Sequence, residues 1–203
     1  MRIVAPTPEG IRLAAEAIRS GQVVAYPTET VYGLAVCPFS EEAVRRLFAA
    51  KGRNPANPVL LLVADGRQLQ EVAAGVSPVA AAYAEAFWPG PLSMLLPKSP
   101  RLPDILTAGG EKVCVRRTAC PIARELCLAV GNAITSSSAN RTGLPPGRSL
   151  AELDLPDIAV AIDGGTLPPS PPSTVFDPDT GKILRQGVIS EADLRAVRLP
   201  HNC

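Results

Sequence analysis

A basic turn between two apolar segments carries side chains that could bind phosphate. Lys51 and Arg53 are separated by a single glycine, and Asn57 follows four residues after Arg53 in a turn braced by Pro55 and Pro58. Two cations and an amide in a rigid loop suit the oxygens of a polyanion. Two basic residues at the end of a helix are, however, often solvated capping charges. The spacing alone therefore leaves a phosphate site and a helix cap as alternatives.

A second candidate site is the hydroxyl-rich run 135–140, which reads Thr-Ser-Ser-Ser-Ala-Asn. Hydroxyls and successive backbone N–H groups at the end of a strand can form a nest for an anion. The same residues can also make an ordinary polar turn with local hydrogen bonds, and we give the two interpretations equal weight. The chain contains no G-x-x-x-x-G-K-[ST] loop and no G-x-G-x-x-G fingerprint, so the common nucleotide-binding loops are not predicted.

Three arginines and one glutamate complete the set of charged candidates. Arg116, Arg117 and Arg185 follow apolar runs that read as strands. Considered singly, each is more often a surface charge than a ligand. Because open α/β sheets bind ligands beyond their strand ends, these arginines could nevertheless line one cleft. Glu29, in the polar run 28–30, could bind a substrate amine or a metal, or could make a local turn hydrogen bond.

The elements that must position these side chains alternate between helix and strand. Apolar runs predict strands, and capped amphipathic segments predict helices. Strands are expected at 23–26, 59–63, 92–96, 113–115, 133–136, 158–162, 174–176 and 182–184, and helices at 7–21, 40–51, 68–74, 77–87, 121–130 and 190–197. Residues 97–112 are expected to be a loop, and 167–173 a proline-rich connector. The alternation predicts one α/β domain, residues 1–203, with a mixed sheet.

Size, charge and cysteine usage restrict the class of protein. A chain of 203 residues can bury a core large enough to be stable without disulfides or structural metals. Its net charge of +1 argues against sequence-independent coating of nucleic acid. The five cysteines form no C-x-x-C pair, which favours reduced thiols over a disulfide framework or a zinc knuckle. Apolar runs are far shorter than the ~20 residues of a membrane helix. A proline near the N-terminus argues against a signal peptide, so a cytoplasmic protein without membrane contact is expected.

The single histidine narrows the possible chemistry. His201 lies next to the C-terminal end, where chain ends fray. A Ser-His-Asp or Cys-His catalytic group and a histidine-ligated zinc are therefore nearly excluded. The remaining groups are lysines, arginines, hydroxyls, backbone N–H groups and a metal held by ligand oxygens.

Five short motifs, taken together, are more specific than any of them alone. They are PTETVYGL at 27–34, KGR at 51–53, WPGPLS at 88–93, SAN at 138–140 with Gly143, and PSTV at 172–175 with LRQG at 184–187. In this order, over residues 21–187, they resemble the threonylcarbamoyl-AMP synthase family, which has a YrdC-like domain. The resemblance implies an α/β domain whose twisted mixed sheet and flanking helices surround a large basic cavity.

The same resemblance implies an activity and partners. L-threonine, bicarbonate and ATP, the last with Mg²⁺, would become threonylcarbamoyl-AMP and pyrophosphate, which is a nucleotidyltransferase reaction. A tRNA-modifying transferase complex would then move the threonylcarbamoyl group to the adenosine beside the anticodon. Weak binding of RNA by the domain itself is a further expectation.

The family motifs also assign site residues. Thr30, Arg116, Ser136 and Ser173 match contacts to threonine. The positions that match contacts to ATP are Lys51, Arg53, Asn57, Lys112, Ser138 and Arg185, with Asn140 in support. Lys51 and Arg53 are further expected to act in catalysis by neutralising phosphate charge, and no protein ligand to a metal is assigned.

Three positions depart from the family pattern, and two alternatives stay open. Thr118 stands where a proline is common, Leu62 where many members have histidine, and Pro146 where many have serine. We expect a less rigid loop after Arg117, and no extra C-terminal domain of the longer Sua5 type. The alternatives are an RNA-binding module without catalysis, which the 4% aromatic content disfavours, and a carbamoyl-adenylate-forming domain as in hydrogenase maturation proteins.

Overall fold

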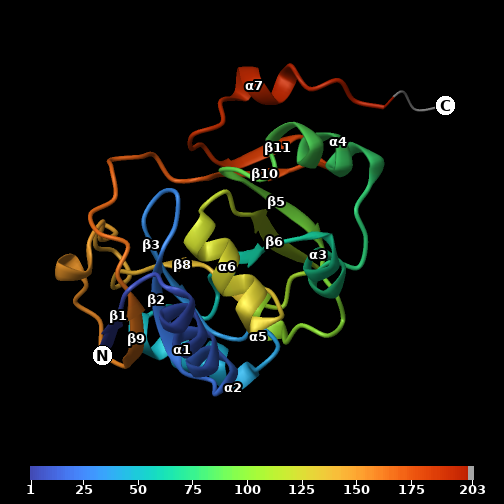
Figure 1. Cartoon of the computed structure of the whole chain (residues 1–203). Helices are drawn as coiled ribbons and strands as arrows, with labels where there is room; N and C mark the ends of the chain where they lie inside the picture. Colours follow the sequence, from blue (N-terminus) through green and yellow to red (C-terminus); the bar gives the residue numbers. More distant parts are fainter. Residues whose placement is uncertain (201–203) are drawn as a thin grey trace.

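Two mixed β-sheets form the centre of the computed structural model, which describes residues 1–200 (Figure 1). The first sheet has five strands in the order β1-β9-β2-β3-β8, and the second has six in the order β11-β10-β5-β6-β4-β7. The predicted α/β class is confirmed, but the expected mixed sheet is divided into two. His201, on which the exclusion of histidine chemistry partly rested, lies outside the described residues.

The described elements largely follow the predicted alternation. The strands are β1 (Arg2–Val4), β2 (Val23–Pro27), β3 (Tyr32–Ala35), β4 (Leu61–Val63), β5 (Leu92–Pro97), β6 (Lys112–Arg117), β7 (Ile134–Thr135), β8 (Ser137–Ser138), β9 (Ile158–Ile162), β10 (Thr174–Asp177) and β11 (Lys182–Arg185). The helices are α1 (Pro8–Arg19), α2 (Glu41–Lys51), α3 (Gly66–Val72), α4 (Pro78–Phe87), α5 (Asp104–Thr107), α6 (Pro121–Val130) and α7 (Glu191–Arg195), with a 3₁₀ turn at Leu150–Glu152. Strand β9 and helix α6 have the predicted bounds.

The segment expected to be one strand at 133–136 is instead two short strands in different sheets. Strand β7 pairs antiparallel with β4 of the second sheet, and β8 pairs antiparallel with β3 of the first. Ser136 lies between them, and its N–H donates to the carbonyl of Leu60 at 2.7 Å. The chain therefore crosses from one sheet to the other inside the hydroxyl-rich run.

Strand β3 was not predicted, because a glycine lowers strand propensity in so short a run. It forms a hairpin with β2, in which Gly33 lies opposite Tyr26. A Cβ atom at Gly33 would lie 3.1 Å from the Tyr26 ring, which is tighter than ordinary contact. Glycine is therefore the residue that lets the tyrosine ring lie across β3. Strand β1 and helix α5 were also missed, as both are very short.

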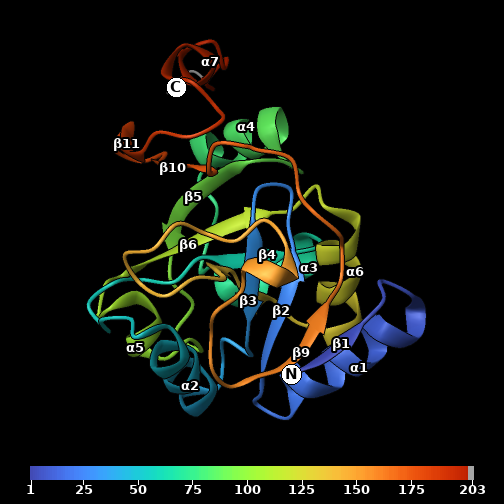
Figure 2. The same cartoon turned by 90° about the vertical axis from the view of Figure 1, so that its left-hand side faces the viewer.

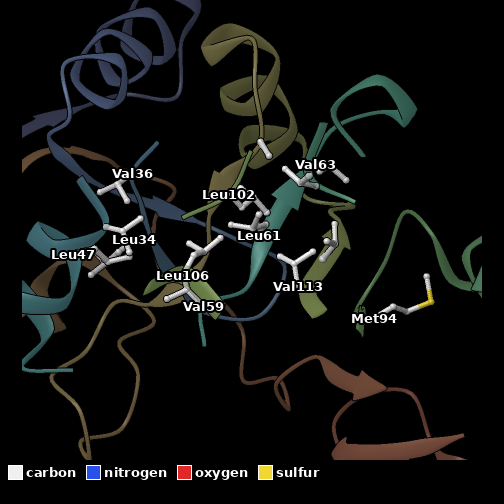
Figure 3. Packing of buried hydrophobic residues seen from close by; sticks show 14 of the residues in the cluster. Leu34, Val36, Leu47, Val59, Leu61, Val63, Met94, Leu102, Leu106 and Val113 are labelled. Carbon is white, nitrogen blue, oxygen red and sulfur yellow. The ribbon is translucent and has the colours of Figure 1, made fainter. Parts of the chain in front are cut away.

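Two buried apolar clusters hold these layers together. The larger takes residues from both sheets and from α2, among them Leu34, Leu47, Leu61 and Met94, so it joins the sheets to each other (Figure 3). The smaller lies where helices α1 and α6, side by side in Figure 1, pack on the first sheet and on β4 and β7 of the second. Each fully buried Leu or Val contributes about 1.5–3 kcal/mol relative to exposure.

The β10–β11 hairpin, α4 and α7 gather at one end of the molecule (Figures 1 and 2). This end is tied to the second sheet, because β10 pairs parallel with β5. Among residues 1–200, the helices are all too short or too polar to cross a membrane.

Candidate functional site

A cavity of about 570 Å³ opens between the two sheets. Its wall includes residues from the β2–β3 turn, the turn after α2, strands β5 and β6, the 136–138 crossover and the β10–β11 hairpin. Seven of the predicted site residues line it: Thr30, Arg53, Arg116, Ser136, Ser138, Ser173 and Arg185. The wall thus carries three arginines and, within the described chain, no carboxylate.

The polar turn after β2 places Thr30 in this wall. Pro27 ends the strand, and the hydroxyl of Thr28 donates to the carbonyl of Val31 at 2.6 Å. The same hydroxyl accepts the backbone N–H of Thr30 at 3.2 Å and that of Val31 at 3.3 Å. One side chain thus satisfies three backbone groups of the turn. Thr30 is thereby fixed while its own hydroxyl remains within reach of the cavity.

Arg116 supplies a buried cation with free hydrogen-bonding capacity. It is 2% exposed and lies inside β6, opposite Leu62 of β4. Its Nε and Nη1 atoms are buried and have no hydrogen-bond partner among residues 1–200, and the carboxylate of Glu29 lies 3.5 Å from Nη1. Leaving buried donors unpaired costs free energy, which a ligand carboxylate could recover through the planar fork of the guanidinium.

Lys51 does not line the cavity, but its ammonium holds part of the cavity wall in place through hydrogen bonds. At the end of α2, where Gly52 takes a left-handed conformation, the Lys51 ammonium donates to the backbone carbonyls of Ser138 and, at 2.7 Å, of Asn140. Burial, and secondarily the charge of Arg53, lowers the pKa of Lys51 to about 8. Lys51 is 2% exposed and does not line the cavity, so its direct contact with ATP stays a prediction.

Arg53 does reach the cavity, and it is braced by the turn that follows it. Its Nε donates to the carbonyl of Asn57 at 3.2 Å, and its Nη2 to the carbonyl of Pro58 at 2.7 Å. Burial lowers the pKa of Arg53. Neither bond goes to the carbonyls of α2 itself, so the helix-cap alternative does not describe this side chain. Asn57 contributes its backbone carbonyl and is otherwise exposed outside the wall.

Arg185 and Ser173 form a second braced unit in the cavity wall. Arg185 Nη2 donates to the carbonyl of Ser173 at 2.9 Å and to its hydroxyl at 3.0 Å. The hydroxyl of Ser173 also lies 2.9 Å from that of Ser93, which is fully buried in β5. The sequence assigned no role to Ser93, although it ends one of the five motifs. That position was the only signal that could have identified it.

Two further predicted residues lie outside the cavity wall. Lys112 pairs with Asp177 at 2.7 Å and with Asp179 at 2.8 Å on the β10–β11 hairpin. The Asn140 side chain donates to the carbonyls of Arg141 and Leu144, and its Oδ1 is buried without a partner. Their predicted contacts with ATP stay predictions.

The three residues that depart from the expected family pattern, Pro146, Leu62 and Thr118, lie in different environments. Pro146 lines the cavity, whereas Leu62 is fully buried in the smaller apolar cluster. Thr118 is fully buried, and its hydroxyl donates to Glu29 at 2.9 Å. A side-chain hydrogen bond therefore holds the loop after β6, and its expected lower rigidity stays a prediction. Among residues 1–200, no group of three or more His, Cys, Asp or Glu side chains is arranged to hold a metal ion.

Comparison with known proteins gives concordant matches. The Sua5/YciO/YrdC family model, described as telomere recombination, matches residues 16–187. A threonylcarbamoyl-AMP synthase from Methylococcus capsulatus is 39% identical over 178 residues, which are 86% of this chain and 96% of that protein. Another from Pyrococcus abyssi is 42% identical over 170 residues, 82% of this chain and 50% of that protein.

A solved structure matches the fold as well as the sequence. The crystal structure of Pyrococcus abyssi Sua5 complexed with L-threonine aligns with a TM-score of 0.81 and 40% identity. The alignment covers 87% of this chain and 53% of the Sua5 chain. The chain therefore spans about half the length of the Pyrococcus relative and nearly all of the Methylococcus one.

Proposed function

The chain belongs to the Sua5/YciO/YrdC family, and we propose that it is an ATP-dependent threonylcarbamoyl-AMP synthase. It combines L-threonine, bicarbonate and ATP into threonylcarbamoyl-AMP and releases pyrophosphate, which makes it a nucleotidyltransferase. The product supplies the modification of the adenosine beside the anticodon of tRNA, carried out by a separate transferase complex. The names of its relatives and the L-threonine complex of Pyrococcus Sua5 support this proposal.

One observation about this chain carries the proposal: a single cavity joins an unsatisfied buried arginine to two braced cations. Arg116 lines the cavity and has N–H groups without a hydrogen-bond partner among residues 1–200, which suit the carboxylate of an amino acid. The hydroxyls of Thr30 and Ser136 share that cavity, while Arg53 and Arg185 line it from other elements. A volume of about 570 Å³ falls in the range of small-molecule sites.

Adenylation of a carbamate needs little covalent help from the protein. The amine of L-threonine attacks the carbon of bicarbonate, and loss of water gives the carbamate. An oxygen of the carbamate then attacks the α-phosphorus of ATP, the bond from this phosphorus to the oxygen that bridges it to the β-phosphate breaks, and pyrophosphate leaves with the electron pair. The task is to align the reactants and to stabilise negative charge that spreads over phosphate oxygens. Arg53 and Arg185 are the cations of the cavity wall that suit this task, and Lys51 holds the backbone of the Ser138 segment in place.

Mg²⁺ would enter with ATP rather than bind to a protein site. Within residues 1–200, the cavity wall supplies hydroxyls and cations and no carboxylate cluster, so phosphate oxygens and water are the ligands that fit the ion. When bound, Mg²⁺ adds positive charge at the phosphates. Apolar wall residues, including Val31, Leu95 and Val175, limit water near a mixed anhydride that water would hydrolyse.

The decisive experiment follows the product directly. The purified protein is incubated with ATP, Mg²⁺, L-threonine and isotope-labelled bicarbonate, and the product is identified by mass spectrometry. We expect labelled threonylcarbamoyl-AMP, with pyrophosphate release that requires threonine and bicarbonate together. Pyrophosphate release indifferent to threonine would remove the proposal and favour a different carbamoyl-adenylate. Salt-steep RNA binding without any pyrophosphate release would favour a binding module instead.

A further inference from the structure

A single carboxylate connects the turn that carries Thr30 to the strand that carries Arg116. Glu29 Oε2 accepts a hydrogen bond from the hydroxyl of Thr118 at 2.9 Å. Its Oε1 accepts from the backbone N–H of Ala119 at 3.4 Å and lies 3.5 Å from Nη1 of Arg116. Glu29 follows β2 in the first sheet, and Thr118 follows β6 in the second. The carboxylate therefore links the two sheets next to the cavity.

Thr118 donates the hydrogen bond to Glu29, because a carboxylate accepts, and it accepts a second one from the backbone. The Thr118 hydroxyl accepts the backbone N–H of Cys120 at 3.2 Å, and the residue is fully buried. A hydroxyl has one proton to donate, and here the proton goes to Glu29. Since Thr118 has no access to water, this bond is not exchanged for a solvent contact.

The distance between Glu29 and Arg116 is too long for a closed ion pair. Charge-assisted bonds between arginine and carboxylate usually shorten to about 2.8 Å and are often two-pronged. At 3.5 Å, Glu29 supplies negative charge while leaving Nε and Nη1 of Arg116 without a hydrogen bond. The bonds from Thr118 and Ala119 pull on both oxygens of the carboxylate and hold it at this distance.

We propose that Thr118 and Glu29 are positioning residues that keep a counterion beside Arg116 without filling its guanidinium fork. Arg116 then remains oriented, and its N–H groups are left to receive the carboxylate of the amino acid substrate. The identity of that substrate rests on the proposed function.

The test is the variant Thr118→Val, which keeps the shape of the side chain and removes the hydroxyl. Glu29, released on one side, is expected to close on Arg116 and compete with the substrate carboxylate. The KM for L-threonine, and its dissociation constant by calorimetry, should rise about tenfold, while kcat and the KM for ATP stay within about twofold. Thr118→Ser should restore the wild-type values.

A matched control is Thr107→Val, which also removes a buried hydroxyl. Thr107 donates to the carbonyl of Gly110 at 2.8 Å and does not line the cavity. It should leave the KM for L-threonine unchanged. An equal rise in the KM for ATP in Thr118→Val, or failure of Thr118→Ser to restore threonine binding, would overturn the inference in favour of a general structural role.

Two further measurements keep the inference testable if Thr118→Val folds poorly. In a Glu29→Gln background, Thr118→Val should change the KM for L-threonine by less than about twofold, because its effect acts through the charge of Glu29. Glu29→Asp, whose shorter side chain cannot reach both donors, should raise that KM as Thr118→Val does; no rise would overturn the inference. A wild-type protein that binds no L-threonine in calorimetry would instead refute the proposed function itself.

Discussion

Replacing Lys51 by methionine should separate activity from stability. Methionine has a similar unbranched shape and no charge. Burial lowers the pKa of Lys51 from 10.5 to about 8, which corresponds to about 3 kcal/mol of cost for keeping the ammonium charged. Methionine removes that cost. It also leaves the carbonyls of Ser138 and Asn140 without their donor, at about 1–2 kcal/mol each.

These opposing contributions nearly cancel in the free energy of unfolding, which should change by only about 1 kcal/mol. No gain offsets the effect on activity, because the backbone segment that presents Ser138 to the cavity loses its hydrogen bonds from Lys51. We expect kcat/KM for ATP to fall about 100-fold. Urea denaturation and a pyrophosphate-release assay measure the two quantities, and Lys182→Met, at an exposed lysine of β11, is the control.

Lys51→Met also isolates the contribution of Lys51 to the pH dependence of the free energy of unfolding. Above pH 8, folded Lys51 loses its proton, whereas the unfolded chain keeps it up to about pH 10.5. Between these values the unfolded state binds more protons, so the free energy of unfolding rises with pH by up to about 3 kcal/mol. Burial raises the pKa of Cys114 to about 12, which acts in the opposite direction above pH 9. The measured quantity is therefore wild type minus Lys51→Met, and a difference that stays flat would refute the reasoning.

Three other perturbations test the site and its frame. Arg116→Lys loses the planar fork and should raise the KM for L-threonine at least about tenfold in steady-state kinetics, and an unchanged KM would contradict the carboxylate role. Gly187→Ala places a Cβ 2.1 Å from the carbonyl oxygen of Pro172, so the unfolding free energy in urea should fall by about 1–3 kcal/mol. Chelation of Mg²⁺ with EDTA should abolish pyrophosphate release without shifting the melting temperature, since no cluster in residues 1–200 holds the ion; a lower melting temperature would indicate a structural metal.

The sequence predicted local structure best where one side chain decides the outcome. The Ser40 hydroxyl caps α2 by accepting the N–H of Ala43 at 3.2 Å, and Gly131 ends α6 in a left-handed conformation. These signals depend on a few adjacent residues, and both elements were predicted. Strand β1 has no such signal, because it is held by parallel pairing with β9 more than 150 residues away. Its existence depends on a partner that local patterns do not identify.

In the candidate site, too, local motifs identified residues, whereas contacts between distant residues were not predicted. The motifs indicated Arg53 and Arg116, and both line the cavity. The partners of Lys51 could not be predicted, because they are carbonyls 87 and 89 residues along the chain. For Glu29 the sequence left three alternatives open. The structure shows it bonded to Thr118 and beside Arg116, a set of contacts that joins two sheets and that spacing does not reveal.

The partners of the basic side chains explain how a chain of net charge +1 can place three arginines in the wall of one cavity. On the surface, arginines pair with acids one helical turn away, as in Arg12–Glu16, Arg45–Glu41, Arg46–Glu42, Arg67–Glu71 and Arg195–Glu191. Around the cavity, Lys51, Arg53 and Arg185 donate to backbone carbonyls instead. A carbonyl fixes the direction of a cation without cancelling its charge, so the charge stays available to an anionic ligand.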